Sequence, residues 1–442
     1  MLRRRGAIAL LLGTLGMTAC DEFSTEPDSS LFVVTIENVS TVHDFFMTGT
    51  FDTPTGAANP GPAGPGAAYE FEFAAPPGAR LSFASMFGQS NDLFYAPDGD
   101  GIALFTNGVP ISGDVTAQVE IWDAGTEQNQ EPGTGSNQAP RQPAPDTGPA
   151  DPNPQVRLAE DEFNNLPAVE AVMQATLTSL GGNRFRLRLE NVGSATVLQT
   201  SAGGMPAPFS PGVWVLHMGT SPLFTAGQAD RGEGLEWIAE QGNPATLAMS
   251  LIGNAGVVTP LSPGVAAIHR ARGALFRAGS LDRGEGLERI AEQGDPTDLA
   301  ASLATSAAVS QVMVFATPAG QSAAGPAIPG TRYEFTVEAS PGDRLSFATM
   351  FGQSNDLFYA PDDDGIALFM GNTPRSGDVS SEVSLWDVGT EVNETPGAGP
   401  NQAPRQSTPD MGTVESRPIA APSDGYVYPA TPDVVRVTIT PQ

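Results

Sequence analysis

Carboxylate side chains recur with the same spacing in two parts of this chain, and they are the groups best suited to do chemistry in it. The two sets are Asp92, Asp123 and Glu127, and Asp356, Asp387 and Glu391. Calcium binds six to eight oxygen atoms, mostly loop carboxylates and carbonyls, and a carboxylate pair can also act as acid and base on a glycoside. The spacing alone favours a simpler interpretation, because aspartate next to glycine or asparagine is usually a turn residue that binds its own backbone.

Other catalytic groups are scarce. All 21 basic residues are arginine, Cys20 is the single cysteine, and the histidines are His43, His217 and His269. Schiff-base and thiol catalysis and disulfides are therefore excluded. His217 and His269 lie among apolar neighbours, which favours packed strand residues over metal ligands. No catalytic triad, zinc signature or phosphate-binding loop is present in the sequence, so we do not expect an enzyme.

Two internal repeats organise the chain. Residues 80–105 recur as residues 344–369 with two differences in 26 positions, and this match extends from about residue 48 to residue 142. A shorter repeat lies between the long copies, where residues 210–244 recur 52 positions later as residues 262–296. Each short copy contains SPGV, a histidine and the segment GEGLE.

The apolar pattern predicts strands in the long repeats and helices in the short ones. Apolar and polar residues alternate over 69–73, 185–189 and 333–337, as in half-buried strands. Residues 31–37 and 435–439 are also expected to be strands. Gly181-Gly182-Asn183 predicts a hairpin turn. In the short repeat, Leu235, Ile238 and Ala239 share one helical face, Gly242 ends that helix, and Asn243-Pro244 begins another.

The predicted fold class is mainly β, with two tandem antiparallel β-sandwich modules. The 50 glycines and 40 prolines indicate many turns, as in β-sandwiches. We expect a truncated module at 31–155, a connection at 156–179 and a complete module at 180–442. The complete module would contain the short duplication at 210–296, with its helices in the crossing connections.

The motifs SNDLF and WDAGTE, together with GEGLEWIAEQG and a strand ending in Glu-Asn-Val, resemble the spondin N-terminal domain family. The resemblance implies a C2-like β-sandwich that binds one calcium ion in each module. Carried onto this sequence, it implies that the ligands are Asp92, Asp123 and Glu127, and Asp356, Asp387 and Glu391. The glutamates depart from the aspartate usual in that family, and the first copy lacks the helical block.

The N-terminus predicts export and a lipid anchor. Arg3, Arg4 and Arg5 precede a short apolar run, and the segment 1–19 ends at Cys20, as in a bacterial lipoprotein signal peptide. An ordinary secretory peptide is the alternative. Acyl chains on Cys20 would attach the protein to a membrane, and residues 20–30 would be a linker. We expect the protein in the bacterial cell envelope, lipid-anchored or secreted.

The charge limits the possible partners. Beyond residue 19 the chain has 18 arginines against 50 acidic residues, which excludes a nucleic-acid surface. The sequence therefore predicts a calcium-binding envelope protein that acts in adhesion or binds an unknown extracellular protein or glycan. The alternatives are a carboxylate-based envelope hydrolase of the glycosidase type and a purely structural envelope protein.

Overall fold

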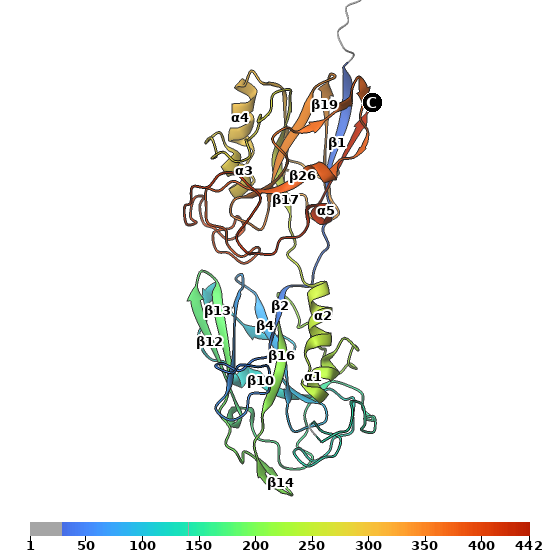
Figure 1. The fold of residues 1–442 in the computed structure, drawn as a ribbon, viewed down its shortest axis with the longest axis vertical. Helices are drawn as coiled ribbons and strands as arrows, with labels where there is room; N and C mark the ends of the chain where they lie inside the picture. The colour runs from blue at the N-terminus through green and yellow to red at the C-terminus, as the bar shows by residue number, and fades with distance from the viewer. Residues whose placement is uncertain (1–28, 140) are drawn as a thin grey trace, which may run out of the picture.

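The computed structural model describes residues 29–139 and 141–442, so the expected signal peptide and Cys20 lie outside the described residues. The fold is mainly β and is built from several antiparallel sheets, which confirms the predicted class at that level. Strand pairing divides these sheets into two groups with no sheet in common. We call residues 45–255 unit I, and residues 30–38 together with 261–442 unit II. Figure 1 shows the two units at opposite ends of an elongated molecule.

Unit I contains two main sheets. One has the order β11-β10-β5-β4-β16-β2, with β6 beside β4, and the other has the order β3-β13-β12-β9. The strands of the first sheet are β2 (Phe45–Phe51), β4 (Arg80–Phe87), β5 (Leu93–Pro97), β6 (Ile102–Ala103), β10 (Val119–Asp123), β11 (Arg157–Leu158) and β16 (Phe209–His217). Those of the second are β3 (Ala68–Ala74), β9 (Gly113–Asp114), β12 (Met173–Gly181) and β13 (Arg184–Asn191). Two small hairpins complete the unit, β7 (Phe105–Thr106) with β8 (Val109–Pro110) and β14 (Leu198–Thr200) with β15 (Gly203–Met205).

Unit II repeats this arrangement. One sheet has the order β18-β17-β20-β21-β26, with β22 beside β20, and the other has the order β19-β1-β27-β25. The strands of the first sheet are β17 (Leu261–His269), β18 (Val309–Phe315), β20 (Arg344–Phe351), β21 (Leu357–Pro361), β22 (Ile366–Ala367) and β26 (Val383–Asp387). Those of the second are β1 (Ser30–Asn38), β19 (Arg332–Ala339), β25 (Gly377–Asp378) and β27 (Val435–Pro441), and a hairpin joins β23 (Phe369–Met370) to β24 (Thr373–Pro374).

The helices are short and agree with the predicted pattern. They are α1 (Leu235–Gln241), α2 (Ala245–Asn254), α3 (Leu287–Gln293), α4 (Thr297–Thr305) and α5 (Thr431–Val434), with 3₁₀ turns at Thr116–Gln118, Val169–Ala171 and Ser380–Glu382. Helix α1 ends at Gly242, whose φ of 65° is the left-handed conformation that glycine adopts without strain. Asn243 Oδ1 accepts a hydrogen bond from Ala245 N at 3.0 Å, so the Asn-Pro pair does begin α2. None of the helices among the described residues is long and apolar enough to cross a membrane.

Each unit has one core between its two sheets and a second core under its helices. In unit I the first core includes Phe71 and Trp214, whose rings stack at 5.5 Å, and the second packs α1 and α2 against Phe94 and Val213. Strand β4 is therefore buried on both faces, whereas β3 alternates buried and exposed residues because only one of its faces meets the core.

The strand pairing differs from the expected division into a truncated module at 31–155 and a complete module at 180–442. The first short repeat forms β16, α1 and α2, and β16 pairs with β2 and β4 of unit I. Strand β1, which precedes unit I in the sequence, pairs instead with β19 and β27 of unit II. Each unit therefore contains one short repeat and a full set of strands. Unit I is inserted between β1 and β17 of unit II.

The hairpin between β12 and β13 gives the physical reason. Gly181, Gly182 and Asn183 have φ values of 83°, 58° and 61°, and they turn the chain so tightly that β13 must lie beside β12. Strand β13 then also pairs with β3, which completes that sheet of unit I. Strand β1 has the equivalent position in unit II, between β19 and β27.

Buried asparagines mark the equivalence of β1 and β13, because both strands end in Glu-Asn-Val. Asn191 Nδ2 donates to the carbonyls of Ala63 and Ala207, each at 2.9 Å. Asn38 Nδ2 donates to the carbonyls of Thr259 and Ala327, each at 2.8 Å. Asn191 thus fixes the end of β13 to two other segments of unit I, and Asn38 fixes the end of β1 to unit II and to the connecting segment 256–260.

Replacing Asn38 with alanine should destabilise unit II, and Asn191→Ala should destabilise unit I. Each change leaves one carbonyl without a donor, that of Thr259 or Ala207, at a loss of about 1–3 kcal/mol per unsatisfied group. The carbonyls of Ala327 and Ala63 keep a backbone donor, Leu261 N and Phe209 N. Denaturant unfolding should show the loss in one of two transitions for each variant. The exposed Gln174→Ala on β12 is the control and should leave both transitions in place. Equal effects of Asn38→Ala and Asn191→Ala on a single shared transition would contradict the assignment of β1 to unit II.

Candidate cation-binding sites

Antiparallel pairing brings the first two predicted acidic residues together in each unit. Asp123 is the last residue of β10 and lies opposite Leu93 on β5, so that it is next to Asp92. Asp387 lies opposite Leu357 in the same way, next to Asp356. A backbone hydrogen bond of 3.1 Å also joins each pair. Ala124 N donates to the carbonyl of Asp92, and Val388 N donates to the carbonyl of Asp356.

Only one of the two carboxylate oxygens of the first aspartate in each pair accepts hydrogen bonds. Asp92 Oδ2 accepts hydrogen bonds from Thr126 N, Thr126 Oγ1 and Glu127 N at 2.9, 3.1 and 3.0 Å. Asp356 Oδ2 accepts the equivalent bonds from Thr390 and Glu391. Both aspartates are fully buried, and neither Oδ1 atom has a hydrogen-bond partner among the described residues. A buried carboxylate oxygen without a partner is costly, because it has given up its hydration and received nothing in return.

The environment raises the pKa of these aspartates. Burial, together with the charge of Asp123, raises the pKa of Asp92 to about 7. Burial and the charge of Asp387 likewise raise the pKa of Asp356 to about 7. The pKa values of Asp123 and Asp387 are also raised, chiefly by burial. A positive charge next to each pair would favour the ionised form of these aspartates.

The third predicted residue of each site is directed elsewhere. Glu127 Oε1 accepts a hydrogen bond from Gly148 N at 2.6 Å, and its Oε2 accepts one from Asn91 Nδ2 at 3.2 Å. Glu391 makes the same bonds to Gly412 N and Asn355. Glu127 thus holds the long loop 128–155 against unit I, and Glu391 holds the segment just after the loop 392–410 against unit II. Across the described ranges, no three His, Cys, Asp or Glu side chains are gathered closely enough to hold a metal by themselves.

The structure adds an asparagine to each site that the sequence reasoning missed. Asn129 Nδ2 donates to Asp123 Oδ2 at 2.7 Å, and Asn393 Nδ2 donates to Asp387 Oδ2 at 2.7 Å. Both asparagines stand six residues after the aspartate in the two copies of the repeat. That shared spacing was a signal that could have found them.

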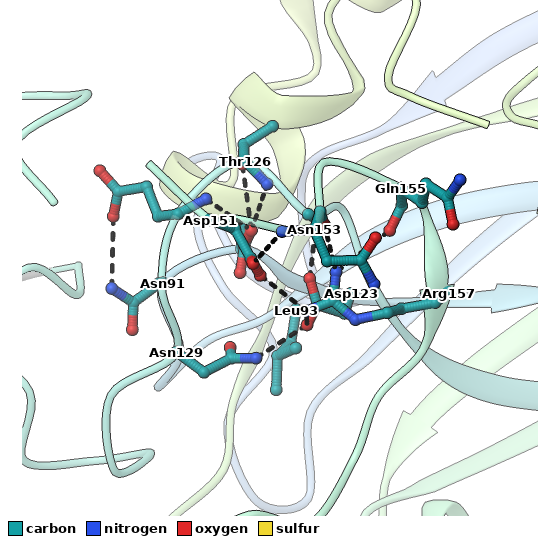
Figure 2. Close-up of polar contacts among 12 residues, drawn as sticks. Asn91, Leu93, Asp123, Thr126, Asn129, Asp151, Asn153, Gln155 and Arg157 are labelled. Carbon is teal, nitrogen blue, oxygen red and sulfur yellow. Dashed lines mark hydrogen bonds and ion pairs between the residues drawn. The ribbon is translucent and has the colours of Figure 1, made fainter. Parts of the chain in front are cut away.

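The two sites differ in the segment that comes after the long loop. In unit I, Arg157 Nη2 lies 2.6 Å from Asp123 Oδ2 and 2.7 Å from Asp151 Oδ2. These residues are drawn in Figure 2. In unit II, the residue opposite Asp387 is Ala420. Asn393 Oδ1 and Glu415 Oε1 are buried there without a hydrogen-bond partner within the described part of the chain. The side chain of Arg417 is 49% exposed, and its Nη1 lies 3.7 Å from Glu415 Oε1.

The buried histidines belong to a different part of each unit. His217 Nε2 lies 2.9 Å from Ser82 Oγ and its Nδ1 lies 2.7 Å from the carbonyl of Gly219, and His269 makes the same contacts with Ser346 and Ala271. Since a carbonyl can only accept, Nδ1 carries the proton and Nε2 accepts from the serine. Burial lowers the pKa of both imidazoles. Both nitrogens of each ring are thus engaged in hydrogen bonds at the end of a strand.

Comparisons with known proteins add no family: no protein-family model and no curated protein matches this chain.

Without divalent cations, the protein should lose stability as the pH rises from 5 to 8. The pKa values of Asp92 and Asp356 are higher in the folded state than the usual value near 4, so the folded chain binds these protons more tightly than the unfolded chain. Their contribution is complete below about pH 4 and is lost as the pH passes about 7, at about 1.4 kcal/mol per unit of pKa difference.

Melting temperatures measured in chelator across this pH range test the expectation. The Asp92→Asn, Asp356→Asn double variant should show a flatter profile than the wild type, since it has removed two groups whose pKa is raised to about 7. Part of the slope should remain, because burial and the charge of Asp146 also raise the pKa of Glu236 to about 7. An exchange of two exposed carboxylates, Asp44→Asn and Glu233→Gln, controls for the general effect of net charge. Parallel profiles for the wild type and the double variant would contradict the raised pKa values.

Proposed function

We propose that this chain is a lipid-anchored bacterial envelope protein whose units are spondin-type β-sandwiches, stiffened by calcium and acting in adhesion or extracellular binding. The observation that carries the proposal is the fully buried Asp356, whose Oδ1 has no partner in the described structure and lies beside a second carboxylate, Asp387. Evolution rarely retains such an unpaired arrangement unless something outside the chain completes it.

The chemistry of the donors in unit II fits calcium. Asp356, Asp387 and the amide oxygen of Asn393 are hard oxygen ligands of the type that calcium prefers, and calcium commonly adds carbonyls and water to such a set. Glu415, the other acidic residue beside Asp387, would contribute further negative charge. Bound there, the ion would supply the positive charge that these groups lack.

The location of these groups suggests what an ion would stabilise. Asp356 lies in the connection between β20 and β21, Asp387 ends β26, and Asn393 and Glu415 belong to the long irregular segment after β26. The ligands would thus hold three segments of unit II together at one end of its sheet. The loops 128–155 and 392–410 are long and largely without regular structure, so we place the recognition surface on them.

The hydrolase alternative receives less support. An acid and base pair made of Asp123 and Glu127 would need both carboxylates to face one substrate. Both side chains are instead buried, and Glu127 is held by Gly148 and Asn91. A purely structural envelope protein would account for the sheets, but it gives no reason for the unpartnered oxygen of Asp356.

Calcium should raise the melting temperature of the purified chain by several degrees relative to chelator, because a ligand that binds only the folded state stabilises it by mass action. Asp387→Asn should abolish the rise, whereas the exposed Glu334→Gln on β19 should preserve it. Magnesium is the matched ion control, since its small octahedral shell suits this donor set poorly. Equal melting temperatures in calcium and chelator would remove the calcium part of the proposal.

The lipid anchor has its own test. Cys20→Ser should move the protein from the membrane fraction to the soluble fraction and abolish its labelling by a fatty-acid analogue, since acyl chains would be attached at that thiol. Ser24→Ala is the neighbouring control and should leave both properties unchanged. Membrane association that survives Cys20→Ser, without acyl labelling of the wild type, would favour the ordinary secretory peptide.

A further inference from the structure

Equivalent contacts define which residue of unit II corresponds to Arg157. Val156 N donates to the carbonyl of Gln228 in unit I, and Ile419 N donates to the carbonyl of Ser280 in unit II, where Gln228 and Ser280 are 52 residues apart. Arg157 lies opposite Asp123 in a strand pair, and the residue opposite Asp387 is Ala420. The structure therefore aligns Arg157 with Ala420, although the main repeat offset of 264 would align it with residue 421.

The Arg157 guanidinium is surrounded by oxygen atoms. Besides its ion pairs with Asp123 and Asp151, its Nη1 donates to the carbonyls of Asn153 and Gln155 at 2.8 and 3.2 Å. Figure 2 shows these partners gathered around its head group. Carboxylates and loop carbonyls are the oxygen donors that calcium uses. In unit I a side chain of the protein itself therefore supplies the positive charge.

Unit II has no side chain that does the same within the described residues. Ala420 ends at its Cβ. Arg417 pairs with Glu415 at 3.7 Å from a half-exposed position, and its charge partly offsets the effect of burial on the pKa of Asp387, but it makes no direct ion pair with Asp387. The buried oxygens left without a hydrogen-bond partner there are Asp356 Oδ1, Asn393 Oδ1 and Glu415 Oε1, and the last of these has only the 3.7 Å ion pair with Arg417. Of the equivalent oxygens in the described part of unit I, Asp92 Oδ1 alone is buried without a hydrogen-bond partner. Asp151, the counterpart of Glu415, is paired with Arg157.

We propose that Arg157 is an internal cation that takes the place of the metal in unit I, so that the chain binds one calcium ion, in unit II, instead of one in each unit. The inference rests on the proposed calcium binding but goes further, because it assigns the ion to one copy of a duplicated site. A divalent ion beside Asp123 would be repelled by the guanidinium and would compete with it for the same oxygens. The two copies thus solve the same shortage of positive charge in different ways.

Exchanging the residues at these two positions tests the assignment. Calcium binding to the full chain is measured by isothermal titration, with the melting temperature as a second readout. The wild type should bind one ion, Asp387→Asn should bind none, and Asp123→Asn should still bind one. Arg157→Ala should gain a second ion, and Ala420→Arg should lose the only one. Position 420 is exposed, so the longer side chain does not have to fit into a core. Arg186→Ala, which removes an exposed ion pair on β13, is the control.

The outcomes separate the two proposals. Two ions per wild-type chain, or one ion that is lost with Asp123→Asn and kept with Asp387→Asn, would overturn the assignment while leaving calcium binding intact. Absence of calcium binding in the wild type and in Arg157→Ala would overturn both. If Arg157→Ala does not fold, the stoichiometry of the wild type and the behaviour of Ala420→Arg still decide the question, because a bound ion that survives Ala420→Arg contradicts the proposed role of the guanidinium.

Discussion

The organisation of both candidate sites depends on one set of hydrogen bonds, which a buried aspartate oxygen accepts from the loop after β10 in unit I and after β26 in unit II. Asp92 and Asp356 each bind two successive backbone N–H groups and a threonine hydroxyl through Oδ2. That arrangement fixes the start of the loop after the second aspartate, which strand pairing places next to the first. It also leaves Oδ1 of the same carboxylate buried and unpaired among the described residues. The need for positive charge at these sites is thus a result of how the loop is fixed.

Much of the local structure could be predicted from the sequence. Alternating residues indicated the strands around Tyr69, Phe185 and Tyr333, and the helix from Leu235 to its end at Gly242 is also explained by its pattern. These predictions succeed because period and turn chemistry act over a few residues. The allocation of strands to units could not be predicted, because β1 and β13 carry the same Glu-Asn-Val ending and either would fit either position. Proximity in the sequence favoured β1 for unit I, and the β12–β13 hairpin overrides it.

The candidate sites could be predicted only in part, for a related reason. The repeat identified Asp92 with Asp123, and Asp356 with Asp387, and strand register does place each pair together. It could not show that the carboxylates of Glu127 and Glu391 are directed to Gly148 and Gly412, because side-chain direction in an irregular loop depends on backbone contacts far along the chain. The role of Arg157 was also hidden, since one missing residue in the second copy shifts the alignment of the repeat just before that position.

The insertion of unit I between β1 and β17 has a mechanical consequence. Unit I is joined to unit II by two chain segments, 39–44 and 256–260, and Figure 1 shows both passing between the units. A pull on the N-terminal side of residue 30 against unit I would act along the axis of β1, which is hydrogen-bonded on both sides by β19 and β27. Such a load would shear all the hydrogen bonds that join β1 to β19 and β27 at once, instead of breaking them one after another. Strand β1, the first strand of the described residues, is thereby the one placed to bear tension. Unit I is held by two connecting segments, which limit its rotation.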